Sequence, residues 1–92
     1  MTNVLSKRRY AVCGLSTRAI SHFVLPLIGA GRVGGNDFSG TCELVGILDL
    51  DSERVGQFLG KVNRSIPVYA PDQMRKMIEE TGAQTVLVAT PD

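Results

Sequence analysis

The chain contains little that could bind a metal, form a disulfide or cross a membrane. Its 92 residues include two cysteines, one histidine and no tryptophan, and only 5% are aromatic. Cys13 and Cys42 have neither C-x-x-C spacing nor a histidine cluster nearby, and His22 has no second ligand at helical spacing, so we expect free thiols and no metal site. No apolar run approaches the roughly 20 residues of a membrane span, and the N-terminus lacks the features of a signal peptide. These absences favour a cytoplasmic protein without a membrane partner.

The charges of the chain are nearly balanced. Ten Lys and Arg residues against nine Asp and Glu residues give a formal net charge of +1, and the one basic run, at positions 7–9, is short. Such a balance gives no electrostatic reason to expect binding to nucleic acid. With 43% apolar residues, the composition is that of one globular unit with a small core, or of part of a larger one.

Short apolar runs alternate with amphipathic stretches along the chain. The runs are typical of strands buried on both faces, and the stretches between them have the apolar spacing of helices. Strands are predicted at 9–14, 42–51, 66–69 and 85–90, and helices at 16–28, from about 52 and from about 72 to 81. This order implies a parallel sheet with right-handed crossovers. We therefore predict an α/β fold, a partial Rossmann-like doubly wound parallel sheet of about four strands and three helices, in which residues 1–92 form the N-terminal part of a dinucleotide-binding domain.

Two prolines bear on this prediction. Pro26 should bend or end the first helix near Leu25, because an interior proline removes a backbone hydrogen bond. Pro67 indicates that the third strand lies at an edge of the sheet, since proline cannot donate to a β-ladder.

The second and third helices each have an apolar stripe and expected caps. The stripes are Val55, Phe58, Leu59 and Val62 in the second helix, and Met74, Met77, Ile78 and Thr81 in the third. The expected caps are Asp51 or Ser52 for the second helix, and Asp72 and a left-handed Gly82 for the third.

Two segments could form a phosphate-binding loop. The glycines at 29, 31 and 34 make a perfect G-x-G-x-x-G, but this fingerprint requires a strand before it and a helix after it. A proline precedes it, which argues against a central strand, and the segment after it has no apolar periodicity. Gly14–Ala19 has Ser16 and Ala19 in place of two glycines, yet it follows a predicted strand and opens a predicted helix. We assign the phosphate loop to Gly14–Ala19 and interpret Gly29–Gly40 as an inserted connection.

Asp49 closes the second predicted strand, where dinucleotide-binding folds place an acid that accepts hydrogen bonds from the adenosine ribose. It lies 35 positions after Gly14 instead of about 20, and the inserted connection accounts for the excess. The next residue, Leu50, is not an arginine that could pair with a 2′-phosphate, so NAD is favoured over NADP. A role for Asp49 as a helix cap is weaker, because Asp51 and Ser52 are better placed for it.

Three segments, Arg9–Ala19, Glu43–Val55 and Ile66–Asp92, together resemble the N-terminal domain of the Gfo/Idh/MocA oxidoreductases, the family of glucose-fructose oxidoreductase and inositol dehydrogenase. The resemblance covers nearly the whole chain outside 29–41, and its most specific part is the final "ATPD". In this family the first loop holds the pyrophosphate, the acid ends the second strand, and the Thr-Pro backbone lies against the cofactor. The resemblance therefore implies that NAD, or with less preference NADP, is bound by Gly14, Ser16, Thr17, Arg18, Asp49, Thr90 and Pro91.

The same resemblance implies a reaction, the transfer of a hydride between the nicotinamide and a sugar, cyclitol or related polyol. The family's catalytic Glu-Lys-Pro segment and downstream histidine or aspartate have no counterpart in this sequence. We therefore expect no catalytic residue here, and a catalytic and substrate domain outside these 92 residues. The alternative is a non-enzymatic nucleotide-sensing or scaffolding module. Arg18 either contacts the pyrophosphate or is a solvated helix residue, and apolar surface left open beside the last strand could be buried in a homo-oligomer.

Overall fold

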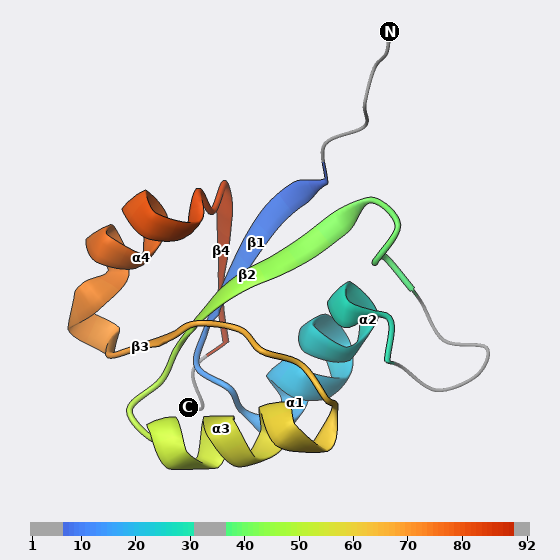
Figure 1. The fold of residues 1–92 in the computed structure, drawn as a ribbon, viewed down its shortest axis with the longest axis horizontal. Helices are drawn as coiled ribbons and strands as arrows, with labels where there is room; N and C mark the ends of the chain where they lie inside the picture. The colour runs from blue at the N-terminus through green and yellow to red at the C-terminus, as the bar shows by residue number, and fades with distance from the viewer. Residues whose placement is uncertain (1–6, 31–36, 90–92) are drawn as a thin grey trace, which may run out of the picture.

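The computed structural model describes residues 7–30 and 37–89, which form one parallel sheet with helices on both faces (Figure 1). The four strands lie in the order β3-β2-β1-β4, and all three strand pairs are parallel. Their bounds are β1 Arg8–Cys13, β2 Cys42–Leu48, β3 Val68–Tyr69 and β4 Thr85–Val88. The strand order reverses direction between β1 and β4, which makes this the switch point of a doubly wound sheet.

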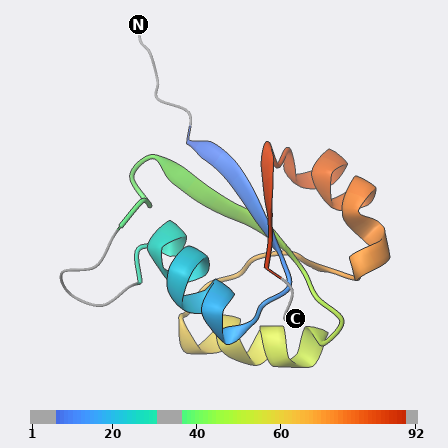
Figure 2. The ribbon, with the colours of Figure 1, turned by 180° about the vertical axis from the view of Figure 1, so that it is seen from behind.

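Helical segments connect successive strands. The first crossover consists of α1 (Thr17–Ala19), the π-helical turn η1 (Ile20–Val24) and α2 (Leu25–Ile28); the second is α3 (Ser52–Lys61); the third consists of the 3₁₀ turn η2 (Pro71–Gln73) and α4 (Met74–Thr81). The first two crossovers cover one face of the sheet, and α4 covers the other (Figures 1 and 2). The predicted fold class, a partial Rossmann-like sheet with three helical crossovers, is confirmed.

Pro26 changes the geometry of the first crossover but does not end it. The turn before the proline widens to π geometry, in which the amide of Leu25 donates to the carbonyl of Ile20. Because a π turn shifts the hydrogen-bond ladder, the missing N–H of Pro26 is accommodated near the start of α2. The helix continues to Ile28 and ends at Gly29, whose φ of 72° is a left-handed cap. Of the two expected outcomes, an end near Leu25 is not found: the helical run continues through Pro26 and changes from π to α geometry at Leu25.

The core has one cluster of buried side chains on each face of the sheet. The larger lies under α1, α2 and α3 and comprises Val12, Leu15, Ala19, Val24, Leu27, Ile28, Leu44, Ile47, Val55 and Leu59. The smaller lies under α4 and comprises Ala11, Leu48 and Met77. A Cβ built on Gly46 would lie 3.0 Å from both Cγ and Sδ of Met77, so α4 approaches the sheet closely at this glycine.

The caps of the second and third crossovers match the sequence in part. Asp51 caps α3, as predicted, by accepting a hydrogen bond from the amide of Arg54 at 3.0 Å. Gly82 ends α4 with a φ of 70°, also as predicted. Asp72 does not act as a cap; instead, the side chain of Gln73 accepts a hydrogen bond from the amide of Ala70 at 2.9 Å. A 3₁₀ turn before α4 moves the helix start past Asp72, which explains the difference.

The edges of the sheet are exposed to different degrees. Pro67 directly precedes the two-residue strand β3 at one edge, as expected. β4 forms the other edge within the described residues, and Val88 is 68% exposed. The other three residues of β4 are only partly buried, so the prediction of a fully buried strand was wrong for all of β4. Ile78, expected in the stripe of α4, is also exposed.

No helix in 7–30 or 37–89 is long and apolar enough to cross a membrane.

Candidate functional site

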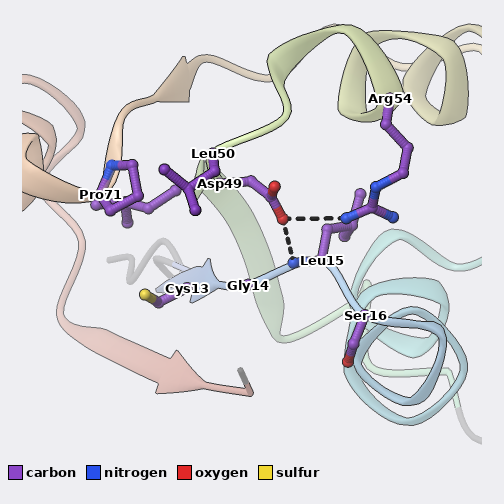
Figure 3. A pocket seen from close by; sticks show the side chains of 9 residues that line it. Cys13, Gly14, Leu15, Ser16, Asp49, Leu50, Arg54 and Pro71 are labelled. Carbon is purple, nitrogen blue, oxygen red and sulfur yellow. Dashed lines mark hydrogen bonds and ion pairs between the residues drawn. The ribbon is translucent and has the colours of Figure 1, made fainter. Parts of the chain in front are cut away.

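A cavity of about 330 Å³ opens at the carboxyl ends of β1 and β2 (Figure 3). Its walls come from the loop after β1, the residues that close β2, the first turn of α3 and the start of η2. The lining residues are Cys13, Gly14, Leu15, Ser16, Leu48, Asp49, Leu50, Arg54 and Pro71. In open parallel sheets, ligands bind at this end of the strands. The cavity therefore lies at the ligand-binding end of the sheet, on the β2 side of the switch point between β1 and β4.

The loop after β1 is held tightly against β2. Gly14 has a φ of 92°, in the region that favours glycine. Its amide donates to the carbonyl of Leu48 at 2.8 Å. Leu15 follows with a fully buried side chain that belongs to the larger core cluster. The loop thus turns sharply while its backbone stays anchored to the neighbouring strand.

Ser16 caps the helix that the loop opens. Its Oγ accepts a hydrogen bond from the amide of Ala19 at 3.1 Å and donates to the carbonyl of Ala89 at 3.2 Å. The first contact is that of an N-cap, and the second ties the loop to the segment after β4. Thr17 and Arg18 are exposed in the first turn of α1 and do not line the cavity.

Asp49 is the polar centre of the cavity. Its Oδ2 accepts a hydrogen bond from the amide of Leu15 at 2.7 Å and forms an ion pair with Nη2 of Arg54 at 3.2 Å. Its Oδ1 accepts from the amide of Asp51 at 2.9 Å. The Asp49 side chain is only 11% exposed. The carboxylate therefore has three protein donors, and it links β2, the loop after β1 and α3 (Figure 3).

Arg54 is the site residue that the sequence analysis missed. Its guanidinium reaches the cavity from the first turn of α3, and its side chain is 46% exposed. The signal that could have found it is its position: the turn after a strand-ending acid brings the first turn of the next helix back beside that acid. A cation five residues after Asp49 was therefore a candidate partner for its carboxylate.

The structure brings together only some of the predicted site residues. Gly14, Ser16 and Asp49 line one cavity, whereas Thr17 and Arg18 lie outside its walls. Thr90 and Pro91 lie outside the described residues, as do Gly31 and Gly34 of the G-x-G-x-x-G. The first glycine of that motif, Gly29, caps a helix and does not follow a strand. The strand that the fingerprint requires before its glycines is thus replaced by α2.

Two titratable groups outside the cavity, Tyr69 and Asp37, have pKa values that hydrogen bonds shift. The hydroxyl of Tyr69 donates to the Glu80 carboxylate at 2.8 Å, and this hydrogen bond raises the pKa of Tyr69. The side chain and backbone of Ser39 both donate to Asp37, which lowers the pKa of Asp37. Within the described part of the chain, no group of three His, Cys, Asp or Glu side chains could hold a metal ion.

Comparisons of the chain with protein-family models, with curated proteins and with solved structures found no match.

Proposed function

We propose that this chain is the NAD(P)-binding portion of an oxidoreductase that transfers a hydride between a nicotinamide cofactor and a sugar, cyclitol or related polyol. The observation that carries the proposal is the cavity at the carboxyl ends of β1 and β2, where a left-handed glycine turn faces a strand-ending acid. This is the place and the residue pair by which doubly wound sheets hold the adenosine half of a dinucleotide. The resemblance to the Gfo/Idh/MocA family supports the same reading.

The start of the first crossover suits a pyrophosphate. Residues 17–28 form one continuous helical run, and the first amides of such a run have no partner within it. Ser16 takes up the amide of Ala19. Within the described part of the chain the amides of Thr17 and Arg18 have no acceptor, so they can bind an anion. The positive end of the helix dipole favours negative charge at this turn, and Arg18 adds an exposed positive charge to the same turn. We therefore assign the pyrophosphate to this turn, with Thr90 and Pro91 as family-implied contacts on the nicotinamide side.

The remaining hydrogen-bonding capacity of Asp49 suits a ribose. A carboxylate offers about four acceptor positions, and three of them have donors in the chain. Among residues 7–30 and 37–89 no donor takes the fourth position, on Oδ1, which can accept from a ribose hydroxyl. Leu50 is 90% exposed beside it and, with Pro71, gives the cavity an apolar wall suited to a base.

The chemistry of the reaction is assigned outside these residues. The cofactor carries the hydride, and the protein must add a substrate site and a proton-transfer group. We assign neither to residues 1–92. We propose that the polyol site lies outside residues 1–92. We also propose that the enzyme is cytoplasmic.

A non-enzymatic nucleotide-sensing or scaffolding module is the second candidate. One observation favours it. Asp49 accepts from three protein donors, so this acid has a structural role whether or not a ligand is bound. A nucleotide-sensing module requires nucleotide binding as the enzyme does, so turnover separates these two, whereas a scaffolding module requires neither. NAD reduction by the native protein with a panel of polyols supports the enzyme, and binding without turnover supports the module.

Calorimetric titration of the folded chain with NAD and NADP tests the binding that the enzyme and the nucleotide-sensing module share. We expect a dissociation constant in the millimolar range or tighter, and a loss of binding in Asp49→Ala. Asp72→Ala is the matched control, because Asp72 is an exposed acid that does not line the cavity. A folded chain that binds neither nucleotide would overturn the proposal.

A further inference from the structure

The loop after β1 is joined to the end of β4 through both backbone groups of Ala89. The amide of Ala89 donates to the carbonyl of Cys13 at 2.9 Å, and the carbonyl of Ala89 accepts from Oγ of Ser16 at 3.2 Å. Ala89 directly follows β4, and Ser16 lies 73 residues before it in the sequence. Because the strand order reverses between β1 and β4, these two hydrogen bonds span the switch point of the sheet.

The cavity ends at Ser16 on the side of β4. Its described walls come from the ends of β1 and β2, the start of α3 and the start of η2, and no residue of β4 is among them. Doubly wound sheets bind a dinucleotide across the switch point, with one half on each side. The cavity therefore suits one half, and a dinucleotide that enters it must pass Ser16 to place its other half beside β4.

The hydroxyl of Ser16 is already bound within the protein. A serine hydroxyl has one donor and two acceptor positions. The donor of Ser16 is used on the carbonyl of Ala89, and Oγ also accepts from the amide of Ala19 at 3.1 Å. Phosphate oxygens accept hydrogen bonds, so this hydroxyl has no donor left for a pyrophosphate. Figure 3 shows it pointing away from Asp49 and Arg54.

We propose that Ser16 is a positioning residue for the dinucleotide: its hydroxyl fixes Ala89, and with it the end of β4, relative to the loop after β1, so that one cofactor can bind on both sides of the switch point. The inference rests on the proposed function and deepens it, because it separates binding of the whole dinucleotide from binding of its adenosine half.

The glycine fingerprint makes the opposite prediction for this position. Its second glycine, which Ser16 replaces, lets the backbone approach the pyrophosphate closely. On that basis Ser16→Gly should strengthen dinucleotide binding. If the hydroxyl positions Ala89, Ser16→Gly should weaken it, because glycine has no side chain that could donate to the Ala89 carbonyl.

Titration calorimetry with NAD and with adenosine 5′-monophosphate tests the proposal, because the monophosphate lacks the half that lies beyond the cavity. Glycine is tolerated at a helix N-cap, so Ser16→Gly removes the hydroxyl with little loss of capping. Since one hydrogen bond is lost, this variant should weaken NAD about threefold to tenfold and change monophosphate binding less than about twofold. Ser16→Thr keeps the hydroxyl and should bind both ligands as the native chain does.

Ser21→Ala is the matched control, because it also removes a serine hydroxyl from the first crossover. Oγ of Ser21 donates to the carbonyl of Arg18 at 3.5 Å, and Ser21 does not line the cavity. This variant should change neither affinity. Circular dichroism and urea denaturation establish that each variant is folded and measure any general loss of stability.

Hydrogen exchange of the Ala89 amide measures the positioning without a ligand. Loss of the Ser16 hydroxyl should make local opening at Ala89 easier, so exchange should be faster in Ser16→Gly and unchanged in Ser21→Ala. Equal exchange in Ser16→Gly and the native chain would overturn the proposal. A loss of NAD affinity in Ser16→Thr as large as that in Ser16→Gly would also overturn it, because the hydroxyl would then not be the determinant.

The binding outcomes separate this inference from the proposed function. Unchanged or tighter NAD binding by Ser16→Gly would overturn the positioning role and leave the nucleotide site standing. An equal loss of both ligands would do the same, because Ser16 would then act on the whole site. Native binding of NAD no tighter than that of the monophosphate would show that nothing beyond the cavity is bound, and would overturn it too. A folded native chain that binds neither ligand would overturn the nucleotide site and this inference together.

Discussion

The carboxylate of Asp49 accepts a hydrogen bond from the amide of Leu15 at 2.7 Å, across 34 residues of sequence. The acid that closes β2 therefore also fixes the loop that follows β1. Because the same carboxylate contacts Arg54 of α3, one side chain joins three walls of the cavity. Its removal should affect stability and ligand binding together, and the two effects can be separated by choosing the substituent.

Asp49→Ala should lower the free energy of unfolding by about 1–3 kcal/mol, because it leaves the amide of Leu15 without its acceptor in a partly buried place. Asp49→Asn should lower it less, since the amide oxygen can still accept from Leu15, and the lost ion pair with half-exposed Arg54 contributes about 0–1 kcal/mol. Urea denaturation of both variants provides the measurement. Equal losses in the two variants would show that the charge, and not the hydrogen bond, stabilises the loop.

Gly14→Ala should destabilise the chain, because φ is 92° at this position. A side chain in this left-handed region costs about 1–2 kcal/mol. Gly56→Ala is the matched control: Gly56 lies inside α3, and a Cβ there would meet nothing within 4 Å. That substitution should stabilise by about 0.5–1 kcal/mol, since alanine is the better helix former. Thermal melts that move in the same direction for both variants would contradict the assigned backbone geometry.

Much of the fold could be predicted from apolar spacing. Val55 and Leu59, one helical turn apart, are both buried on the sheet, and Gly82 ends α4 as its type and position predicted. Such features depend on neighbours in sequence, which a periodic pattern records directly. The sequence context also predicted that the G-x-G-x-x-G does not follow a strand, and Gly29 indeed ends a helix.

The structure differs from the sequence-based predictions where contacts between distant parts of the chain determine the local conformation or exposure. The π turn before Pro26 keeps the first crossover helical over a proline, and the helix that follows buries Leu27 and Ile28 in the core. The position of Arg54, five residues after Asp49, made it a candidate partner for the acid, but the contact itself depends on the path of the chain between β2 and α3. The exposure of Val88 depends on which elements lie beside β4, and a strand pattern does not contain that information.

The hydrogen bond from Tyr69 to Glu80 predicts a pH effect of definite sign. Donation to a carboxylate favours the protonated phenol, so the pKa of Tyr69 lies above its ordinary value of 10.0. Its contribution to stability is therefore complete below about pH 10 and is lost as the pH rises through the raised pKa. In a Tyr10→Phe background Tyr69 is the one remaining tyrosine, and its ultraviolet titration should shift down when Glu80→Gln is added. Identical midpoints would refute the contact.

Nucleotide affinity should distinguish the two glycine-rich segments. Gly31 lies outside the described residues, but Gly29 before it caps α2 and lies away from the cavity. Because no strand leads into this motif, Gly31→Ala should leave the affinity for NAD unchanged. Gly14→Ala, by contrast, should weaken it, since the turn at Gly14 presents the first amides of the α1 run. Titration calorimetry on both folded variants provides the comparison, and a large loss for Gly31→Ala with none for Gly14→Ala would move the phosphate loop to the other segment.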